Sequence, residues 1–200
     1  GTLYQKEELT ELWQTCQDCG LILFVDGARL GYGLMSEACD LTLPELAKRC
    51  DVFYLGGTKQ GLLFGEAVVI SNPAIKRDFR YLMKQHGGML AKGRLLGVQF
   101  CAVLEDGLYF ELARKADQQA MVLRRAFEDR GYSMLFDSYT NQQYPILPDG
   151  VLEELKQDFA FSFWSKVDGK HTAVRVCTSW ATEDQAVQAL IQALDRCGQK

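Results

Sequence analysis

Two short apolar runs, each ending in a polar segment, constrain the fold of this 200-residue chain more than any other feature. Residues 21–25 read LILFV and lead into Asp26, and residues 52–55 read VFYL and lead through Gly-Gly-Thr into Lys59. The segment between them, 43–49, has a proline where the first turn of a helix tolerates one. Strand, crossover helix and strand together predict a right-handed parallel βαβ unit.

The predicted unit brings two reactive side chains to the same edge of the sheet. Parallel strands share the edge at which their carboxyl ends emerge, and open α/β folds bind ligands there. We therefore expect Asp26 and Lys59 to face one crevice. Neighbouring strands lie about 4.8 Å apart, so the two side chains can hold opposite ends of one small aromatic ring. Pyridoxal 5'-phosphate (PLP) needs this pair, a lysine amine for its aldehyde carbon and a carboxylate for its ring nitrogen.

Each of the two residues also has a simpler interpretation when it is taken alone. An acid that follows a buried strand often caps a turn, and a lysine in a glycine-rich loop is usually a solvated surface charge. Their joint placement at matching strand ends favours the cofactor hypothesis. The segment GGTKQG lacks the spacing of a phosphate-binding P-loop, which excludes that alternative.

Two segments resemble those of the L-threonine aldolase and β-eliminating lyase family. They are LFVDGAR at 23–29 and DVFYLGGTK at 51–59, and the resemblance extends in order through most of the chain. It implies the α/β fold of the aspartate aminotransferases, the PLP-dependent transferase-like fold type I. On this basis we expect residues 1–105 to be the C-terminal half of the PLP-binding large domain, with a mostly parallel sheet. Residues 106–200 would form a small α+β C-terminal domain.

The resemblance also implies roles for individual residues at the cofactor. Asp26 would pair with the pyridine nitrogen, Lys59 would bind the cofactor covalently, and Arg29 would point at the cofactor or at the substrate carboxylate. The family usually has a serine before the lysine and a glycine after it. Here Thr58 keeps the hydroxyl, and so a role towards the phosphate or the lysine, whereas Gln60 departs from the pattern.

A second candidate for the substrate carboxylate is Arg175, which stands between two valines in a predicted strand. Alternation alone favours a side chain that faces water. The segment RVCTSW, which Arg175 opens, resembles the family segment whose arginine holds the substrate α-carboxylate. The planar guanidinium suits bidentate binding of a carboxylate.

Periodicity and turn residues predict the other elements of the chain. The basic segment 84–94 is interpreted equally well as a loop near the cofactor phosphate or a partner subunit and as a solvated connection. The expected helices cover 6–19, 73–85, 95–130 with a break near 106–107, and 185–197. The expected strands cover 66–70, antiparallel to its neighbour, then 133–136, 144–147, 160–166 and 172–179, with a hairpin turn at 167–170.

Bulk composition narrows the classes of partner. A net charge of −4 gives no basic footprint for nucleic acid, and no apolar run approaches the roughly 20 residues of a membrane span. Seven scattered cysteines form no disulfide framework, and we expect reduced thiols in the cytoplasm. The pair Cys16 and Cys19 has C-x-x-C spacing without a second pair, so we expect no metal site.

These observations lead to one function and several alternatives. We expect a PLP-dependent carbon–carbon lyase that cleaves a β-hydroxy-α-amino acid such as threonine to glycine and an aldehyde. The alternatives are β-elimination from an aromatic or sulfur amino acid, transamination, and a non-catalytic remnant. No segment matches the N-terminal half of the large domain, which in the family carries the phosphate cradle. We therefore expect this chain alone to be inactive and the intact parent to be a homodimer or homotetramer.

Overall fold

The computed structural model describes residues 1–197 and divides the chain into two compact units. The first, here called the N-terminal unit, comprises residues 4–34 and 39–112. The second, the C-terminal unit, comprises residues 1–3, 35–38 and the chain from 113 onward. The division falls inside helix α6 (Leu108–Glu128), seven residues beyond the boundary expected at 105/106.

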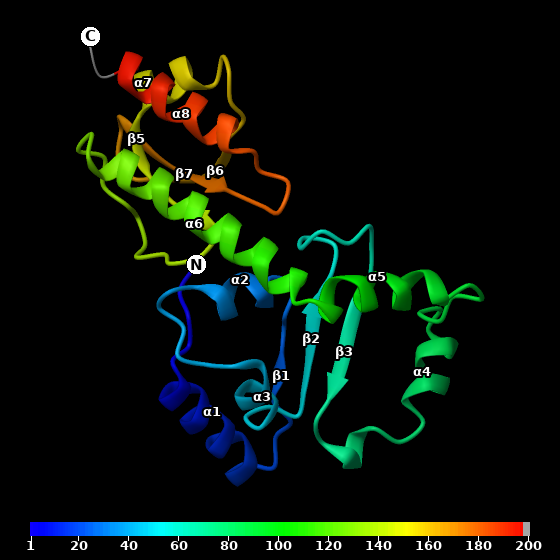
Figure 1. The fold of residues 1–200 in the computed structure, drawn as a ribbon. Helices are drawn as coiled ribbons and strands as arrows, with labels where there is room; N and C mark the ends of the chain where they lie inside the picture. Colours follow the sequence, from blue (N-terminus) through cyan, green and yellow to red (C-terminus); the bar gives the residue numbers. More distant parts are fainter. Residues whose placement is uncertain (198–200) are drawn as a thin grey trace. The chain divides into compact units, whose positions relative to one another are not determined.

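The N-terminal unit contains a three-stranded sheet in the order β1-β2-β3 (Figure 1). Strand β1 (Phe24–Val25) is parallel to β2 (Val52–Gly56), and β2 is antiparallel to β3 (Glu66–Ile70). Helix α3 (Leu43–Ala47) lies between β1 and β2 in the chain. The predicted βαβ unit and the antiparallel third strand are confirmed. Strand β1 is shorter than the expected 21–25, because only its last two residues pair with β2.

The two faces of this sheet differ in burial. Phe53 and Leu55 of β2 are buried in a core that includes Leu9 of α1 (Lys6–Asp18) and Leu46 of α3. The alternate residues point to the other face, since successive side chains of a strand alternate. That second face is partly open and apolar, and its exposed members include Phe24 and Val68.

The remaining helices of the N-terminal unit follow local signals, with one correction. Helix α2 spans Leu30–Met35, and α5 (Arg94–Glu105) is separated from α6 at Gly107, whose φ is +74°. This confirms the break expected near 106–107. The single helix expected over 73–85 is wrong, because Asp78 adopts a left-handed φ of +56° that interrupts it. The segment instead forms a 3₁₀ turn (Pro73–Ile75) and helix α4 (Phe79–Gln85).

The C-terminal unit is built on a second sheet, in which the central strand β7 (His171–Cys177) pairs antiparallel with three others. The hairpin turn expected at 167–170 joins β6 to β7 and is confirmed. The strand expected at 133–136 is wrong, since only Met134 forms an isolated bridge there. The partners of β7 are β4 (Gln142–Gln143), β5 (Ile146–Pro148) and β6 (Ser162–Lys166).

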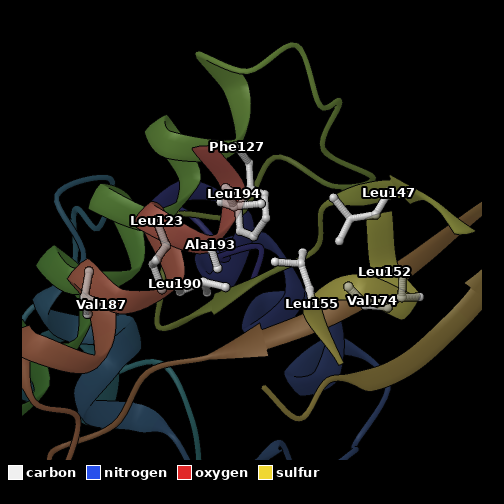
Figure 2. Packing of buried hydrophobic residues seen from close by; sticks show 10 residues of the cluster. All are labelled: Leu123, Phe127, Leu147, Leu152, Leu155, Val174, Val187, Leu190, Ala193 and Leu194. Atoms are coloured by element: carbon white, nitrogen blue, oxygen red, sulfur yellow. The ribbon is translucent and has the colours of Figure 1, made fainter. Parts of the chain in front are cut away.

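Helices cover this second sheet and supply most of its core. Figure 2 shows that leucines of α7 (Asp149–Leu155) and α8 (Asp184–Cys197) meet Phe127 of α6 and Val174 of β7. Helix α6 buries a stripe of apolar residues at three- and four-residue spacing, namely Ala113, Ala116, Ala120, Leu123 and Phe127. Helix α7 and strand β4 were not predicted. Within residues 1–197, no helix is both long and apolar enough to cross a bilayer.

Candidate active site

The carboxyl ends of β1 and β2 approach each other closely because two glycines stand there. The N–H of Gly56 donates to the carbonyl of Gly27 at 2.9 Å. A Cβ on Gly27 would lie 1.5 Å from the Tyr54 carbonyl oxygen, and one on Gly56 would lie 2.3 Å from that of Ala28. Both positions therefore require glycine. The close approach places Asp26 beside Tyr54. The loop that carries Lys59 follows β2 directly.

The Asp26 carboxylate is held by two donors on one oxygen. Oδ1 accepts the backbone N–H of Ala28 at 3.0 Å and the hydroxyl of Tyr54. The Tyr54 hydrogen bond, followed by the Ala28 N–H, holds the pKa of Asp26 below its usual value, and the charges of Lys59 and Arg29 lower it further. Asp26 is thus ionised at neutral pH, with two cations close enough to act on it.

The loop after β2 fixes the backbone of Lys59 while its side chain stays exposed. The N–H of Gln60 donates to the Gly57 carbonyl at 2.9 Å, which closes a tight turn around Thr58 and Lys59. The buried Tyr32 of α2 donates its hydroxyl to the Lys59 carbonyl oxygen. Thr58 and Lys59 both present exposed side chains. The amine and the hydroxyl are therefore carried by a constrained turn and are accessible to a ligand.

Gln60, the departure from the family pattern, is a structural residue. Its side chain is fully buried, and its Oε1 accepts the N–H of Gly31 at 2.8 Å and the hydroxyl of Tyr109 at 3.0 Å. A Cβ on Gly31 would lie 2.0 Å from the Gln60 side-chain nitrogen. The glutamine thus ties the lysine loop to the start of α2, in space that glycine at position 31 leaves open.

A second acid lies near Lys59. Glu66 opens β3 opposite Gly56, and its Oε2 accepts the N–H of Gly57 at 3.0 Å. Partial burial raises the pKa of Glu66, whereas the Gly57 N–H and the charge of Lys59 act to lower it. The charge of Lys59 therefore acts on two carboxylates, Asp26, whose pKa is lowered, and Glu66, whose pKa is raised.

Arg175 lies on β7, in the other unit, and is half-buried. One terminal nitrogen, Nη1, makes a long hydrogen bond of 3.4 Å to Oε1 of Gln142. Its Nε is buried and has no hydrogen-bond partner among residues 1–197. A buried guanidinium N–H without a partner is costly, and it is a donor that a carboxylate can satisfy. The role of Arg175 towards a substrate stays a prediction.

Comparison with known proteins identifies the family. Residues 1–148 match the model of the Beta-eliminating lyase family. The chain belongs to this family. A low specificity L-threonine aldolase of Pseudomonas sp. (strain NCIMB 10558) is 32% identical to it over 193 residues, covering 95% of this chain and 54% of the relative. The chain thus spans about half the length of the curated relatives it matches.

Solved structures agree with the beta-eliminating lyase assignment and confirm the α/β fold of type I. The threonine aldolase of Leishmania major superposes with a TM-score of 0.96 at 40% identity, over 99% of this chain and 58% of that one. A serine palmitoyltransferase of Sphingomonas wittichii, at 14% identity, shares the fold alone, with a TM-score of 0.65 over 96% of this chain and 50% of its own.

Three residues of the candidate site were missed as site residues in the sequence, namely Tyr54, Glu66 and Gln60. Tyr54 could be found only once the register was known: with Phe24 opposite Val52 and Val25 opposite Phe53, the next position pairs Asp26 with Tyr54. Glu66 and Gln60 had no signal either, since Glu66 binds the N–H of Gly57 and Gln60 binds the N–H of Gly31 and the hydroxyl of Tyr109, contacts that depend on the folded loop. The roles assigned to Lys59, Asp26, Arg29 and Thr58 towards a ligand stay predictions.

The chemistry of these donors defines what the site can hold. An ionised carboxylate suits a protonated ring nitrogen, an exposed lysine amine can bond to a carbonyl carbon, and a hydroxyl can donate to a phosphate. On the side of the sheet towards Asp26, the open face offers apolar side chains such as Phe24 and Val68. This set fits a flat aromatic ring that carries a basic nitrogen at one end and an aldehyde at the other.

Proposed function

We propose that the protein containing this chain is a PLP-dependent lyase that cleaves a β-hydroxy-α-amino acid such as threonine to glycine and an aldehyde. The observation that carries the proposal is the placement of Asp26, held ionised, at the end of β1 beside the turn that presents Lys59 after the parallel β2. The similarity to the threonine aldolase of Leishmania major over nearly the whole chain supports the aldol reaction in particular.

PLP, when bound, supplies an electron sink for the electron pair left at the substrate α-carbon as the Cα–Cβ bond breaks. The chain would contribute the groups that hold and orient it. The Lys59 amine would bond to the cofactor's aldehyde carbon, and Asp26 Oδ2 would accept a hydrogen bond from the protonated ring nitrogen. The Thr58 hydroxyl would donate to the phosphate. By holding a full negative charge at the ring nitrogen, Asp26 keeps a proton there.

Two arginines would orient the amino-acid substrate. Arg175, with a buried Nε that lacks a partner among residues 1–197, would bind the α-carboxylate through its planar fork. Arg29, whose charge already acts on Asp26, would point at the cofactor or assist at the carboxylate. A guanidinium bound to the carboxylate through two parallel hydrogen bonds would leave it few orientations, and so would align one bond at the α-carbon for cleavage.

We further propose the organisation of the intact protein. Residues 1–105 would belong to the PLP-binding large domain and residues 106–200 to a smaller α+β domain. A homodimer or homotetramer is supported by the partly open apolar face of the β1-β2-β3 sheet, because the parallel β1-β2 pair needs cover on both faces. A cytoplasmic location is supported by the cysteine pattern, because seven cysteines scattered along the sequence form no disulfide framework.

The family name keeps one alternative open, β-elimination on the same scaffold. A product assay on the full-length protein with PLP separates the two reactions. Incubation with threonine should yield glycine and acetaldehyde, which supports the proposal. Formation of pyruvate and ammonia from a sulfur or aromatic amino acid, with no aldehyde from threonine, would show a β-eliminating enzyme. No change in visible absorption on addition of PLP would show a protein that has lost the cofactor.

A further inference from the structure

Tyr54 is a side chain that the proposed chemistry does not yet use, although it contacts the central carboxylate. It lies in the middle of β2, on the sheet face opposite the buried Phe53 and Leu55. Its hydroxyl donates to Oδ1 of Asp26. The strand register explains the contact, because Asp26 follows Val25 and therefore comes level with Tyr54 across the parallel pair.

The Tyr54 ring is itself held from the neighbouring strand. Its centroid lies 5.8 Å from that of Phe24, with an interplanar angle of 39°. Phe24 and Asp26 are two residues apart, so both project from β1 on the same face as Tyr54. Phe24 thus packs against the ring while Asp26 accepts its hydroxyl, and the phenol has little freedom to turn away.

We propose that Tyr54 is a positioning residue, which fixes one oxygen of the Asp26 carboxylate so that the other faces the ring nitrogen of the cofactor. The part of the inference that concerns the cofactor rests on the proposed function, and the part that concerns the Tyr54–Asp26 contact does not. Among residues 1–197, both hydrogen bonds described for the Asp26 side chain end on Oδ1. A carboxylate with two donors on one oxygen cannot rotate without losing both. Oδ2 is thereby left to accept the N–H of a protonated ring.

The charges around the pair agree with this arrangement. The shared hydrogen bond raises the pKa of Tyr54 to about 12 and is the leading cause of the lowered pKa of Asp26. The charges of Lys59 and Arg29 also lower the pKa of Asp26. The charge of the nearby Glu66 contributes to the raised pKa of Tyr54, and the charge of Asp26 acts to raise the pKa of Glu66. Tyr54 therefore stays a donor at any physiological pH and favours the ionised carboxylate that a ring proton requires.

The test compares Tyr54→Phe with Tyr81→Phe in the full-length protein. Tyr81 lies on α4 and is 78% exposed, so its change is a matched control. In the protein freed of PLP, NMR titration of isotope-labelled aspartate carboxyl groups should show a higher pKa for Asp26 in Tyr54→Phe and no change in Tyr81→Phe. Asp26→Asn identifies the resonance. An unchanged Asp26 pKa in Tyr54→Phe would overturn the inference.

A double-mutant cycle then tests the cofactor half. In wild type, Tyr54→Phe should weaken PLP binding about tenfold, the effect of losing one hydrogen bond to a charged group. In the Asp26→Asn background the same change should alter binding by less than about twofold, because Tyr54 acts through the carboxylate. Equal losses in both backgrounds would overturn the inference while leaving the proposed function intact. Failure of the wild-type protein to bind PLP would overturn the proposed function and this half together, and the NMR result would still decide the Tyr54–Asp26 coupling.

Discussion

The side-chain oxygen of Gln60 accepts the backbone N–H of Gly31 at 2.8 Å, and this one bond joins the lysine loop to the start of α2. The same oxygen accepts the hydroxyl of Tyr109, which also donates to the Gly56 carbonyl at 3.0 Å. The turn that presents Lys59 is therefore anchored through a buried side chain. Gln60 therefore contributes both to the stability of the fold and to the position of the loop that carries Lys59.

Replacing Gln60 with Ala should destabilise the fold by about 3 kcal/mol. The change leaves the buried N–H of Gly31 without an acceptor, costing about 1–3 kcal/mol, and creates a cavity as well. Urea unfolding measures the difference. Gln157→Ala, at an exposed position, is the control and should stay within about 0.5 kcal/mol of wild type. Equal stability of Gln60→Ala and the control would contradict the anchoring role.

Asp117 of α6 should make stability depend on pH in an unusual direction. Burial raises the pKa of Asp117 to about 8, with partial relief from the nearby backbone N–H of Asn141. The pKa of Asp117 in the folded state exceeds the unfolded value of about 3.9. The contribution of the protonated carboxyl group to the free energy of unfolding is therefore complete below about pH 4 and is lost as the pH rises towards 8.

Asp117→Asn should remove that dependence. At pH 8 the variant should be more stable than wild type by on the order of 3 kcal/mol, and at pH 4 the two should be similar. Chemical unfolding at several pH values measures this. Asp129→Asn, at an exposed position just after the C-terminal end of α6, is the control. Parallel pH profiles for wild type and Asp117→Asn would show that the carboxyl group titrates normally.

Asp26→Asn should separate cofactor attachment from catalysis. The amide keeps the shape but removes the charge that holds a proton on the ring nitrogen. Turnover should fall by orders of magnitude, while PLP still attaches to Lys59 and absorbs in the visible range. Steady-state kinetics and absorption spectra on the same preparation test both parts. Unchanged turnover would mean that Asp26 serves only the turn before Ala28.

Arg175→Lys should weaken substrate binding without disturbing the cofactor. Lysine keeps the charge but loses the planar fork and the Nε donor. We expect the KM for threonine to rise about tenfold or more, the loss of a charge-assisted hydrogen bond, with the cofactor absorption unchanged. Arg77→Lys, whose side chain is 90% exposed, provides the control. An unchanged KM would refute the assignment of the carboxylate to Arg175.

The sequence predicted the parts of the fold that depend on local pattern and near neighbours. The parallel β1-β2 pair, the antiparallel β3, the break at Gly107 and the β6-β7 hairpin all have short-range signals, and all are confirmed. The break at Asp78 was missed because it needs a left-handed φ in a non-glycine residue, which helical periodicity does not reveal. The expected strand at 133–136 failed because its pairing with 144–146 amounts to one isolated bridge at Met134 and two flanking backbone hydrogen bonds, and does not continue as a ladder.

The candidate site divides in the same way. Asp26 and Lys59 follow apolar runs, so their place at one sheet edge was predictable from the order of the strands. Tyr54 looked like an ordinary strand residue, and its contact with Asp26 depends on the register. Gln60 looked like a flaw in the family pattern, and its burial depends on Gly31 and Tyr109, which are distant in sequence. Such long-range polar contacts leave no periodic signal.

The position at which PLP becomes attached tests the central claim most directly. The full-length protein is incubated with PLP, reduced with borohydride and digested, and the labelled peptide is sequenced by mass spectrometry. The account predicts a single modified residue, Lys59, with the label lost in Lys59→Ala. A label on Lys84 or Lys92 instead, or no label at all under conditions in which the protein is folded, would contradict it.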